Sequence, residues 1–274
     1  MEKIGMVGLG AMGSALLERL KLAGVEATVF DVAAPALEAA RALGARIADS
    51  PKAVAQASTI IDVVVRTDEE VLACTVGGNG IFDGAQAGAL VLLHSTARPE
   101  TTLKVADAGR QRGIDVIDAC MTATPKYVRQ GNLTFLVGGP SELVERAKPH
   151  LLHMGKEVMH MGPLGAGNVA KLIKNLVTGS EALIVYEAIQ IGLAGGIPCE
   201  KALEMMRKVR SESVLNRWQE RFDVSGKNPK MLVGGNIYDK DIPLAAQIAR
   251  QLGVGVPITQ QLAAEGQRLV AAKE

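Results

Sequence analysis

The N-terminal part of the chain alternates short apolar runs with Ala- and Leu-rich segments of helical periodicity. The apolar runs lie at residues 3–7, 27–30, 60–65, 89–94, 115–118, 133–137 and 157–160. The helical segments between them lie at residues 11–22, 36–43, 99–112 and 141–153. Continuous apolar strands that alternate with helices predict a mostly parallel sheet with helices on both faces.

Beyond residue 162 the short apolar runs stop and the helical periodicity continues. Helices are predicted over residues 168–194, 199–209, 212–221, 241–252 and 258–272, separated by Gly and Pro. A length of 274 residues also favours two domains over one. We therefore expect a doubly wound α/β domain over residues 1–162 and a helical domain over residues 163–274.

The composition is that of a folded and nearly neutral protein. Apolar residues make up 48% of the chain and charged residues 22%, and the net charge is +1. This balance provides no broad positive field for nucleic acid or an anionic membrane, so small molecules are the expected partners. The three cysteines lie far apart without C-x-x-C spacing, which predicts reduced thiols and a cytoplasmic location. We expect neither a signal peptide nor a membrane span.

A glycine-rich turn follows the first predicted strand and opens the first predicted helix. It reads Gly8-Leu9-Gly10-Ala11-Met12-Gly13. In a G-x-G-x-x-G turn the first glycine permits the tight turn, the second lets a pyrophosphate approach, and the third allows helix and strand to pack closely. The N-terminus of the helix then faces the phosphates. In this context the turn predicts a dinucleotide-binding site.

The second predicted strand ends at Asp31. A carboxylate at this place accepts hydrogen bonds from the adenosine ribose and repels a 2′-phosphate. The segment that follows, Val-Ala-Ala-Pro-Ala-Leu, contains no arginine to receive such a phosphate. The favoured cofactor is therefore NAD, with NADP as the other possibility. A generic glycine turn beside a surface aspartate is the alternative interpretation.

The predicted helix that starts at residue 168 is apolar apart from one narrow polar strip. At about 100° per residue, Asn168, Lys171 and Asn175 lie on that strip, and apolar side chains fill most of the opposite side, so we expect a largely buried helix. A lysine in a partly dry cleft has a lowered pKa and can exchange a proton near neutral pH. Lys171 is thus a candidate acid–base group with Asn175 beside it, and a lysine whose stem merely covers apolar surface is the alternative.

Six motifs, in this order, resemble the β-hydroxyacid dehydrogenases, a family that includes 3-hydroxyisobutyrate dehydrogenase and tartronate semialdehyde reductase. They are GLGAMG (8–13), HSTARPE (94–100), DACMTATP (118–125), GNLTFLVGG (131–139), GPLGAGNVAKLIKN (162–175) and KDIPLA (240–245). The resemblance spans nearly the whole chain. It implies a Rossmann domain, a long interdomain helix that carries a catalytic lysine, and a helical domain that builds a homodimer or a higher oligomer.

The resemblance also implies roles for individual residues. Lys171 would be the catalytic lysine, and Asn175 would orient the substrate. Thr96 would lie against the nicotinamide, and Lys240 would reach the cofactor and the substrate from the helical domain. The remaining cofactor-binding positions would be Gly8, Leu9, Gly10, Ala11, Met12, Gly13, Asp31, Val65 and Arg66, where Val65 and Arg66 replace the usual Leu-Pro.

The loop expected to hold the acid group of the substrate departs from the family pattern. Most relatives read Asp-Ala-Pro-Val-Ser-Gly-Gly, whereas this chain reads DACMTATP over residues 118–125. Thr122 still offers a hydroxyl, and Ala123 and Thr124 remain positions that line the substrate site. The glycine pair is absent, and Pro125 removes a backbone donor. The anion pocket must therefore differ from that of the relatives.

The leading hypothesis is an NAD(P)-dependent oxidoreductase that interconverts a small β-hydroxy acid and its semialdehyde or oxo acid, with Lys171 as general acid and base. Imine reductases are one alternative, because they resemble this architecture but usually place Asp or Tyr where Lys171 stands. A dinucleotide-binding module without turnover is the other. No metal is expected, since His150, His153 and His160 lack an accompanying cluster of cysteines or carboxylates.

Overall fold

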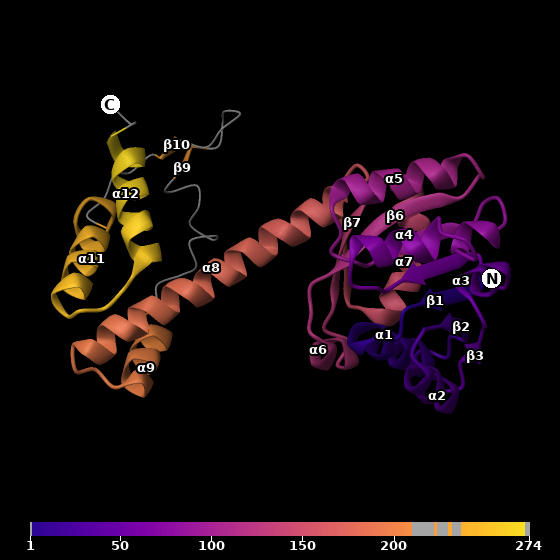
Figure 1. Cartoon of the computed structure of the whole chain (residues 1–274), viewed down its shortest axis with the longest axis horizontal. Helices are drawn as coiled ribbons and strands as arrows, with labels where there is room; N and C mark the ends of the chain where they lie inside the picture. The colour runs from indigo at the N-terminus through magenta and orange to yellow at the C-terminus, as the bar shows by residue number, and fades with distance from the viewer. Residues whose placement is uncertain (1, 210–221, 224–229, 232–236, 272–274) are drawn as a thin grey trace. The chain divides into compact units, whose positions relative to one another are not determined.

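A computed structural model of the chain describes residues 2–209, 222–223, 230–231 and 237–271. The chain divides into two compact units, Met1–Asn175 and Leu176–Glu274, shown in Figure 1. The first unit extends beyond the predicted boundary at residue 162, because the first turns of the long helix α8 (Ala166–Ala194) pack with the sheet. The boundary between domains at residue 162 stays a prediction.

An eight-stranded sheet forms the centre of the first unit, in the order β3-β2-β1-β4-β5-β6-β7-β8. The strands are β1 (Ile4–Val7), β2 (Ala27–Phe30), β3 (Arg46–Ile47), β4 (Ile60–Val63), β5 (Leu90–Leu93), β6 (Asp115–Met121), β7 (Thr134–Gly138) and β8 (Glu157–Gly162). All neighbours are parallel except β6 and β7, which confirms the mostly parallel sheet. Strand order reverses between β1 and β4, and in such sheets ligands bind beyond the carboxyl ends at that point.

Helices cover both faces of this sheet, as Figure 1 shows. They are α1 (Ala11–Leu22), α2 (Ala34–Ala42), α3 (Pro51–Gln56), α4 (Asp68–Thr75), the 3-10 turn Ile81–Asp83, α5 (Pro99–Arg110), α6 (Pro125–Arg129) and α7 (Ser141–Met154). Successive residues of a strand point to opposite faces. Leu90 and Leu92 of β5 accordingly pack with α1 and α7 in one core, and Val91 and Leu93 pack with α3, α4 and α5 in the other.

The apolar pattern located most of these elements but not the short ones. Helix α1 has the predicted limits. Helices α3 and α6 and the two-residue strand β3 were not predicted, because segments of two to six residues carry too few residues to display a period, and the eight-residue helix α4 was not predicted either. Strand β6 continues to Met121, so the start of the segment predicted as the substrate loop is buried strand.

The second unit consists mainly of helices, in agreement with the prediction. Its described elements are most of α8, α9 (Cys199–Val209), the two-residue strands β9 (Phe222–Asp223) and β10 (Lys230–Met231), a π-helical turn (Ile237–Asp241), α11 (Ile242–Gln251) and α12 (Pro257–Ala271). The predicted helix over residues 212–221 lies outside the described residues. Glu187 of α8 accepts hydrogen bonds from the backbone N–H groups of Ile258 (2.9 Å) and Thr259 (2.7 Å), and so caps the start of α12.

Helix α8 is more exposed than its apolar sequence predicts. Within the single chain Leu172 is 47% exposed, Ile173 58% and Leu176 69%, so the expectation of a largely buried helix is wrong for one copy of the chain. An apolar pattern indicates that the side chains of a helix are to be buried, but it does not indicate whether the same chain or another one buries them. By length and composition alone α8 could also cross a membrane. One such helix is weak evidence, so the absence of a membrane span stays a prediction.

Candidate active site

The glycine turn between β1 and α1 has the geometry that its sequence requires. Gly8 has a positive φ of +99°, and a Cβ atom there would lie 2.3 Å from the carbonyl oxygen of Val64. A Cβ on Gly13 would lie 2.1 Å from the carbonyl oxygen of Gly8. At Gly10, by contrast, a Cβ would meet no atom of the described residues within 4 Å. The turn is therefore packed on its inner side and open at Gly10, where a pyrophosphate would approach the N-terminus of α1.

Asp31 follows β2, and its carboxylate is hydrogen-bonded to the backbone of the glycine turn. Its Oδ2 accepts a hydrogen bond from the backbone N–H of Leu9 at 2.6 Å, and its Oδ1 accepts one from Ala33 at 2.8 Å. Each carboxylate oxygen has a second lone pair, so both can still accept from ribose hydroxyls. Together with the open approach at Gly10, this donor and acceptor set fits the adenosine and pyrophosphate of a dinucleotide.

Replacing Asp31 with Ser should narrow the preference for NAD over NADP. The substitution removes the negative charge that would repel a 2′-phosphate, and one unit charge at about 4 Å contributes about 1 kcal/mol in water and more in a partly dry site. We expect the ratio of kcat/KM for NAD to that for NADP to fall about tenfold. An unchanged ratio, measured by cofactor absorbance, would remove the reason for favouring NAD.

The segments after β4 and β5 meet next to the glycine turn. The Ser95 hydroxyl donates a hydrogen bond to the carbonyl oxygen of Val65 at 2.7 Å. Thr96, the next residue, is exposed at the carboxyl end of the sheet. The side chain of Arg66 is also exposed, and its backbone N–H donates to the Glu70 carboxylate at 2.7 Å. This N–H is therefore already engaged, and a nucleotide contact at Arg66 would have to use its other groups.

Asp118 of β6 anchors the start of α8. Its Oδ1 accepts from the backbone N–H of Gly165 and its Oδ2 from that of Asn168, both at 2.7 Å. A negative charge at a helix N-terminus is stabilised by the helix dipole. Burial nevertheless raises the pKa of the Asp118 carboxyl above its ordinary value, against the effect of these N–H groups. The contact needs a glycine at position 167, because a Cβ there would lie 2.5 Å from Oδ2 of Asp118.

Lys171 lies one turn further along α8, and its amine points back to the sheet. The Nζ atom donates a hydrogen bond to the carbonyl oxygen of Met121, the last residue of β6, at 2.5 Å. The side chain is half-buried, and this burial, followed by the positive charge of Lys174, lowers the pKa of the Lys171 amine. The amine therefore lies at the carboxyl end of the sheet, the edge that also carries the glycine turn and Thr96. Asn175, one further turn along, is exposed.

The segment after β6 differs from the sequence expectation. The hydroxyl of Thr122 donates a hydrogen bond to the carbonyl oxygen of Thr134 in β7 at 2.9 Å, so it can offer a ligand only acceptor lone pairs. Ala123 is half-buried, and Thr124 is exposed at the start of α6. Lys240 belongs to the second unit, where its exposed Nζ lies 3.5 Å from Oδ1 of Asp241. Its proposed contact with cofactor and substrate stays a prediction.

A buried polar cluster in the sheet was missed from the sequence. Asp62 of β4 is fully buried, and its two carboxylate oxygens each lie 2.8 Å from an Nε2 atom, one of His94 and one of His150. The Nδ1 atom of His94 lies 2.7 Å from the carbonyl oxygen of Ala119. Burial opposes ionisation of Asp62, but the charges and hydrogen bonds of the two imidazoles outweigh it and hold its pKa well below the ordinary value. An aspartate within the apolar run 60–65 was the available signal.

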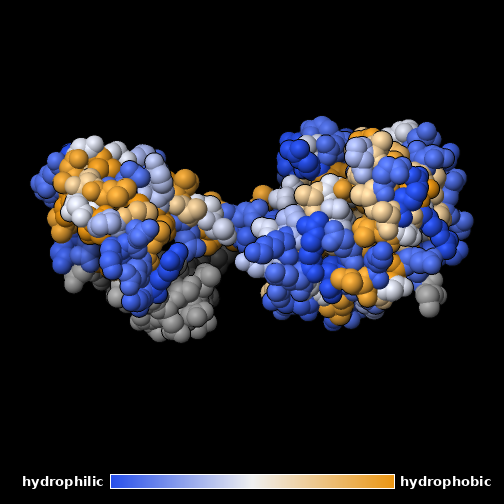
Figure 2. All heavy atoms as spheres, turned by 90° about the horizontal axis from the view of Figure 1, so that it is seen from below, coloured by the Kyte–Doolittle hydropathy of each residue, from blue (hydrophilic) through white to orange (hydrophobic). Residues whose placement is uncertain are grey.

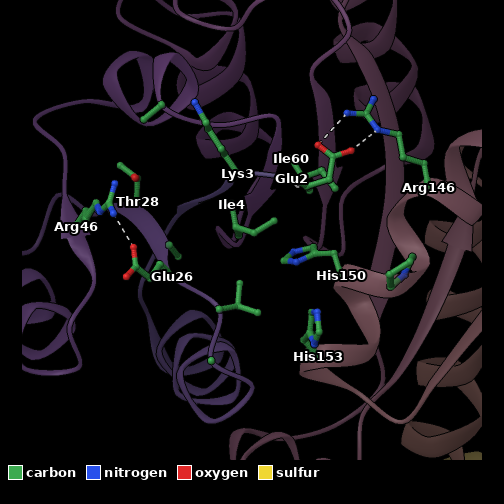
Figure 3. Close-up of a pocket in the computed structure, with 15 residues that line it drawn as sticks. Glu2, Lys3, Ile4, Glu26, Thr28, Arg46, Ile60, Arg146, His150 and His153 are labelled. Carbon is green, nitrogen blue, oxygen red and sulfur yellow. Dashed lines mark hydrogen bonds and ion pairs between the residues drawn. The ribbon is translucent and has the colours of Figure 1, made fainter.

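A cavity of about 770 Å³ lies at the opposite edge of the sheet, next to the amino ends of β1, β2 and β4. Figure 3 shows His150 and His153 of α7 pointing into it, flanked by the ion pairs of Arg46 with Glu26 and of Arg146 with Glu2. The glycine turn and Lys171 lie at the carboxyl edge. This cavity is therefore separate from the candidate active site.

Comparisons with known proteins agree with this geometry. A family model described as the NAD binding domain of 6-phosphogluconate dehydrogenase matches residues 3–162, and one described as the NAD-binding part of NADP-dependent 3-hydroxyisobutyrate dehydrogenase matches residues 165–274. The 2-(hydroxymethyl)glutarate dehydrogenase of Eubacterium barkeri is 31% identical over 94% of this chain and 85% of its own length. The 3-hydroxyisobutyrate dehydrogenase of Pseudomonas aeruginosa is 30% identical over 94% of this chain and 89% of its own length.

Similar folds are found among solved structures. A variant of the imine reductase from Myxococcus stipitatus, in complex with NAD+, superposes with a TM-score of 0.85 over 99% of this chain and 94% of that one, at 22% identity. An identity this low supports a common fold and no more.

The chain belongs to the β-hydroxyacid dehydrogenase family. It is an oxidoreductase with a Rossmann-type NAD(P)-binding domain followed by a helical domain. The resemblance drawn from the six sequence motifs is thereby confirmed. A cytoplasmic location and the roles of individual residues stay predictions.

Proposed function

We propose that this protein interconverts a small β-hydroxy acid and its semialdehyde or oxo acid, with NAD as the favoured cofactor and Lys171 as general acid and base. The main support is the position of the Lys171 amine. It is half-buried, its pKa is lowered, and a hydrogen bond to Met121 holds it at the edge of the sheet where the glycine turn lies. A surface lysine that merely covers apolar side chains would not be held by a strand end.

When bound, the nicotinamide supplies the hydride chemistry. During oxidation the substrate carbon gives up a hydride, and the neutral amine of Lys171 accepts the hydroxyl proton as the carbonyl forms. In the reverse direction the ammonium of Lys171 returns that proton to the oxygen. The hydrogen bond to Met121 uses one N–H of Lys171, so the other N–H groups of the ammonium can donate to the substrate oxygen. Proton transfer by a positioned side chain contributes about 10²–10⁴-fold to the rate.

The substrate class is proposed from the chemistry shared by two relatives. Their names specify 2-(hydroxymethyl)glutarate and 3-hydroxyisobutyrate as substrates, and both compounds carry a hydroxymethyl group beside a carboxylate. In this chain the loop at Thr122–Thr124 would line the carboxylate site. Because the Thr122 hydroxyl donates to β7, the anion must be held mainly by other groups. We therefore expect a substrate range that differs from those of the two relatives.

A homodimer is proposed as the working form. The apolar side chains of α8 that are exposed in one chain include Leu176, Leu183 and Tyr186. Figure 2 shows further hydrophobic side chains gathered on the surface of the helical unit. Exposed apolar patches of this kind favour association with a second copy of the chain.

A substrate screen tests the proposed function. Small hydroxy acids, semialdehydes and cyclic imines are offered with NAD or NADP, and cofactor absorbance reports turnover. We expect turnover with at least one hydroxy acid or semialdehyde and none with the imines. Turnover only with imines would favour an imine reductase, and cofactor binding without any turnover would favour a binding module.

A further inference from the structure

We propose that Asn168 is a positioning residue for the reaction, because its side chain joins the first turn of α8 to the segment that carries Thr96. Lys171 follows on the same helix, about 4.5 Å further along its axis. This inference rests on the proposed role of Lys171. It assigns to Asn168 no contact with substrate or cofactor, only control over where Lys171 stands relative to the nicotinamide site.

The carboxamide of Asn168 is completely buried and fully hydrogen-bonded. Its Oδ1 accepts from the Thr102 hydroxyl of α5 at 2.8 Å, and its Nδ2 donates to the carbonyl oxygen of Ser95 at 3.3 Å. Nδ2 also lies 3.3 Å from the sulfur of Cys120. Exchanging the oxygen and nitrogen would set the amide oxygen against the Ser95 carbonyl, so the contacts specify one orientation.

These contacts connect the strand ends that form the candidate site. Ser95, which Asn168 holds, donates its own hydroxyl to the carbonyl oxygen of Val65 after β4. Cys120 immediately precedes Met121, whose carbonyl oxygen accepts from Lys171. The ends of β4, β5 and β6 and the first turn of α8 are thus linked through one buried amide and its neighbour Ser95. A fully satisfied buried network of this kind fixes one arrangement of the segments that it joins.

The placement matters because hydride and proton transfer require the reacting atoms to be aligned. A misplacement of about 1 Å can lower a rate about 10²-fold. Asp118 also holds the first turn of α8, through the backbone N–H of Asn168, so removing the carboxamide should leave the helix folded. What is lost is the link between α8 and Ser95. The expected result is a folded enzyme that binds cofactor but reacts slowly.

The test compares three variants with the wild-type enzyme, using the hydroxy acid found in the substrate screen. Asn168→Ala removes the amide, and Thr102→Val removes one of its partners without changing size. Thr75→Val is the matched control, because Thr75 is also buried and, among the residues that the structure describes, its hydroxyl bonds only to the carbonyl oxygen of Val71 in its own helix α4. Measured quantities are kcat, KM, the cofactor Kd and the primary isotope effect with substrate deuterated at the hydroxyl-bearing carbon.

We expect kcat to fall about 10²-fold for Asn168→Ala and about tenfold for Thr102→Val, with Thr75→Val within twofold of wild type. The cofactor Kd should stay within about threefold, and the isotope effect should rise because hydride transfer becomes the slow step. An unchanged kcat in folded Asn168→Ala would overturn the proposal. So would a loss of kcat matched by an equal loss of cofactor affinity with an unchanged isotope effect, which would indicate general loosening.

Two further results separate the possible failures. If Asn168→Ala does not fold, Thr102→Val decides: a lower kcat with a larger isotope effect supports the proposal, and an unchanged kcat overturns it. If Lys171→Ala keeps its turnover, the proposed function itself is wrong. Loss of turnover in Lys171→Ala together with full turnover in Asn168→Ala would reject the positioning role alone.

Discussion

Replacing Lys171 with Ala should lower kcat at least about 10²-fold while cofactor affinity stays within about twofold. The amine is the proposed proton carrier, and it does not belong to the glycine turn or to the Asp31 site that would hold the dinucleotide. Single-turnover measurements of cofactor absorbance and equilibrium cofactor titrations check the two parts separately. Retained turnover would exclude proton transfer by this lysine.

The pH dependence of turnover in the wild-type enzyme should also follow the ionisation of the Lys171 amine. Burial and the charge of Lys174 lower the pKa of Lys171, so its neutral amine is present at a lower pH than for a free lysine. Oxidation needs the neutral amine and should increase as pH rises through this pKa, whereas reduction needs the ammonium and should decline over the same range.

Lys174→Ala provides the matched control for Lys171→Ala. It removes a neighbouring lysine from the same helix, and with it the like charge that lowers the pKa of Lys171. Turnover should persist, with the pH profile of oxidation displaced toward higher pH. A profile that stays in place would show that another group controls the ionisation.

Local sequence patterns predicted the parts of the site that depend on neighbours along the chain. The glycine turn is one example, because its Gly-x-Gly-x-x-Gly spacing lies within one strand–turn–helix unit, where Gly13 packs against the carbonyl oxygen of Gly8. Lys171 is another, since a helical period alone places it on the same strip as Asn168. Its hydrogen bond to Met121 could not be predicted, because it depends on β6 running three residues beyond its predicted end.

Contacts between side chains that lie far apart in the sequence could not be predicted from local sequence patterns. His94 and His150 lie 32 and 88 residues from Asp62, and nothing local pairs them. His150 and His153 lie three residues apart on one helix, but that spacing does not indicate that Nε2 of His150 bonds to Asp62. The side-chain contacts of Asn168 were missed for the same reason, since Thr102 and Ser95 reach it from other elements. Burial of α8 was predicted wrongly because an apolar period does not identify the covering surface.

Replacing Asp62 with Asn should lower the free energy of unfolding of the domain that contains the sheet. The Asp62 carboxylate accepts a hydrogen bond from Nε2 of each imidazole, whereas the amide of an asparagine would offer one acceptor oxygen and one NH₂ donor. The substitution would leave one buried imidazole N–H facing a donor, and a buried polar group without a hydrogen-bond partner costs about 1–3 kcal/mol. We expect the urea midpoint at neutral pH to fall accordingly, as followed by circular dichroism.

The sign of the pH dependence follows from the lowered pKa of Asp62. Below about pH 4 the unfolded chain takes up a proton on this carboxyl, whose ordinary pKa is about 3.9, while the folded chain does not. The stabilisation from Asp62 is therefore complete above that range and is lost progressively as the pH falls through it, so the difference between wild type and Asp62→Asn should shrink in acid.

Asp107→Asn is the matched control, because Asp107 forms an exposed ion pair with Arg110 and should contribute less than about 1 kcal/mol. Equal effects of the two substitutions at neutral pH would mean that the buried Asp62 carboxylate contributes no more to stability than an exposed one.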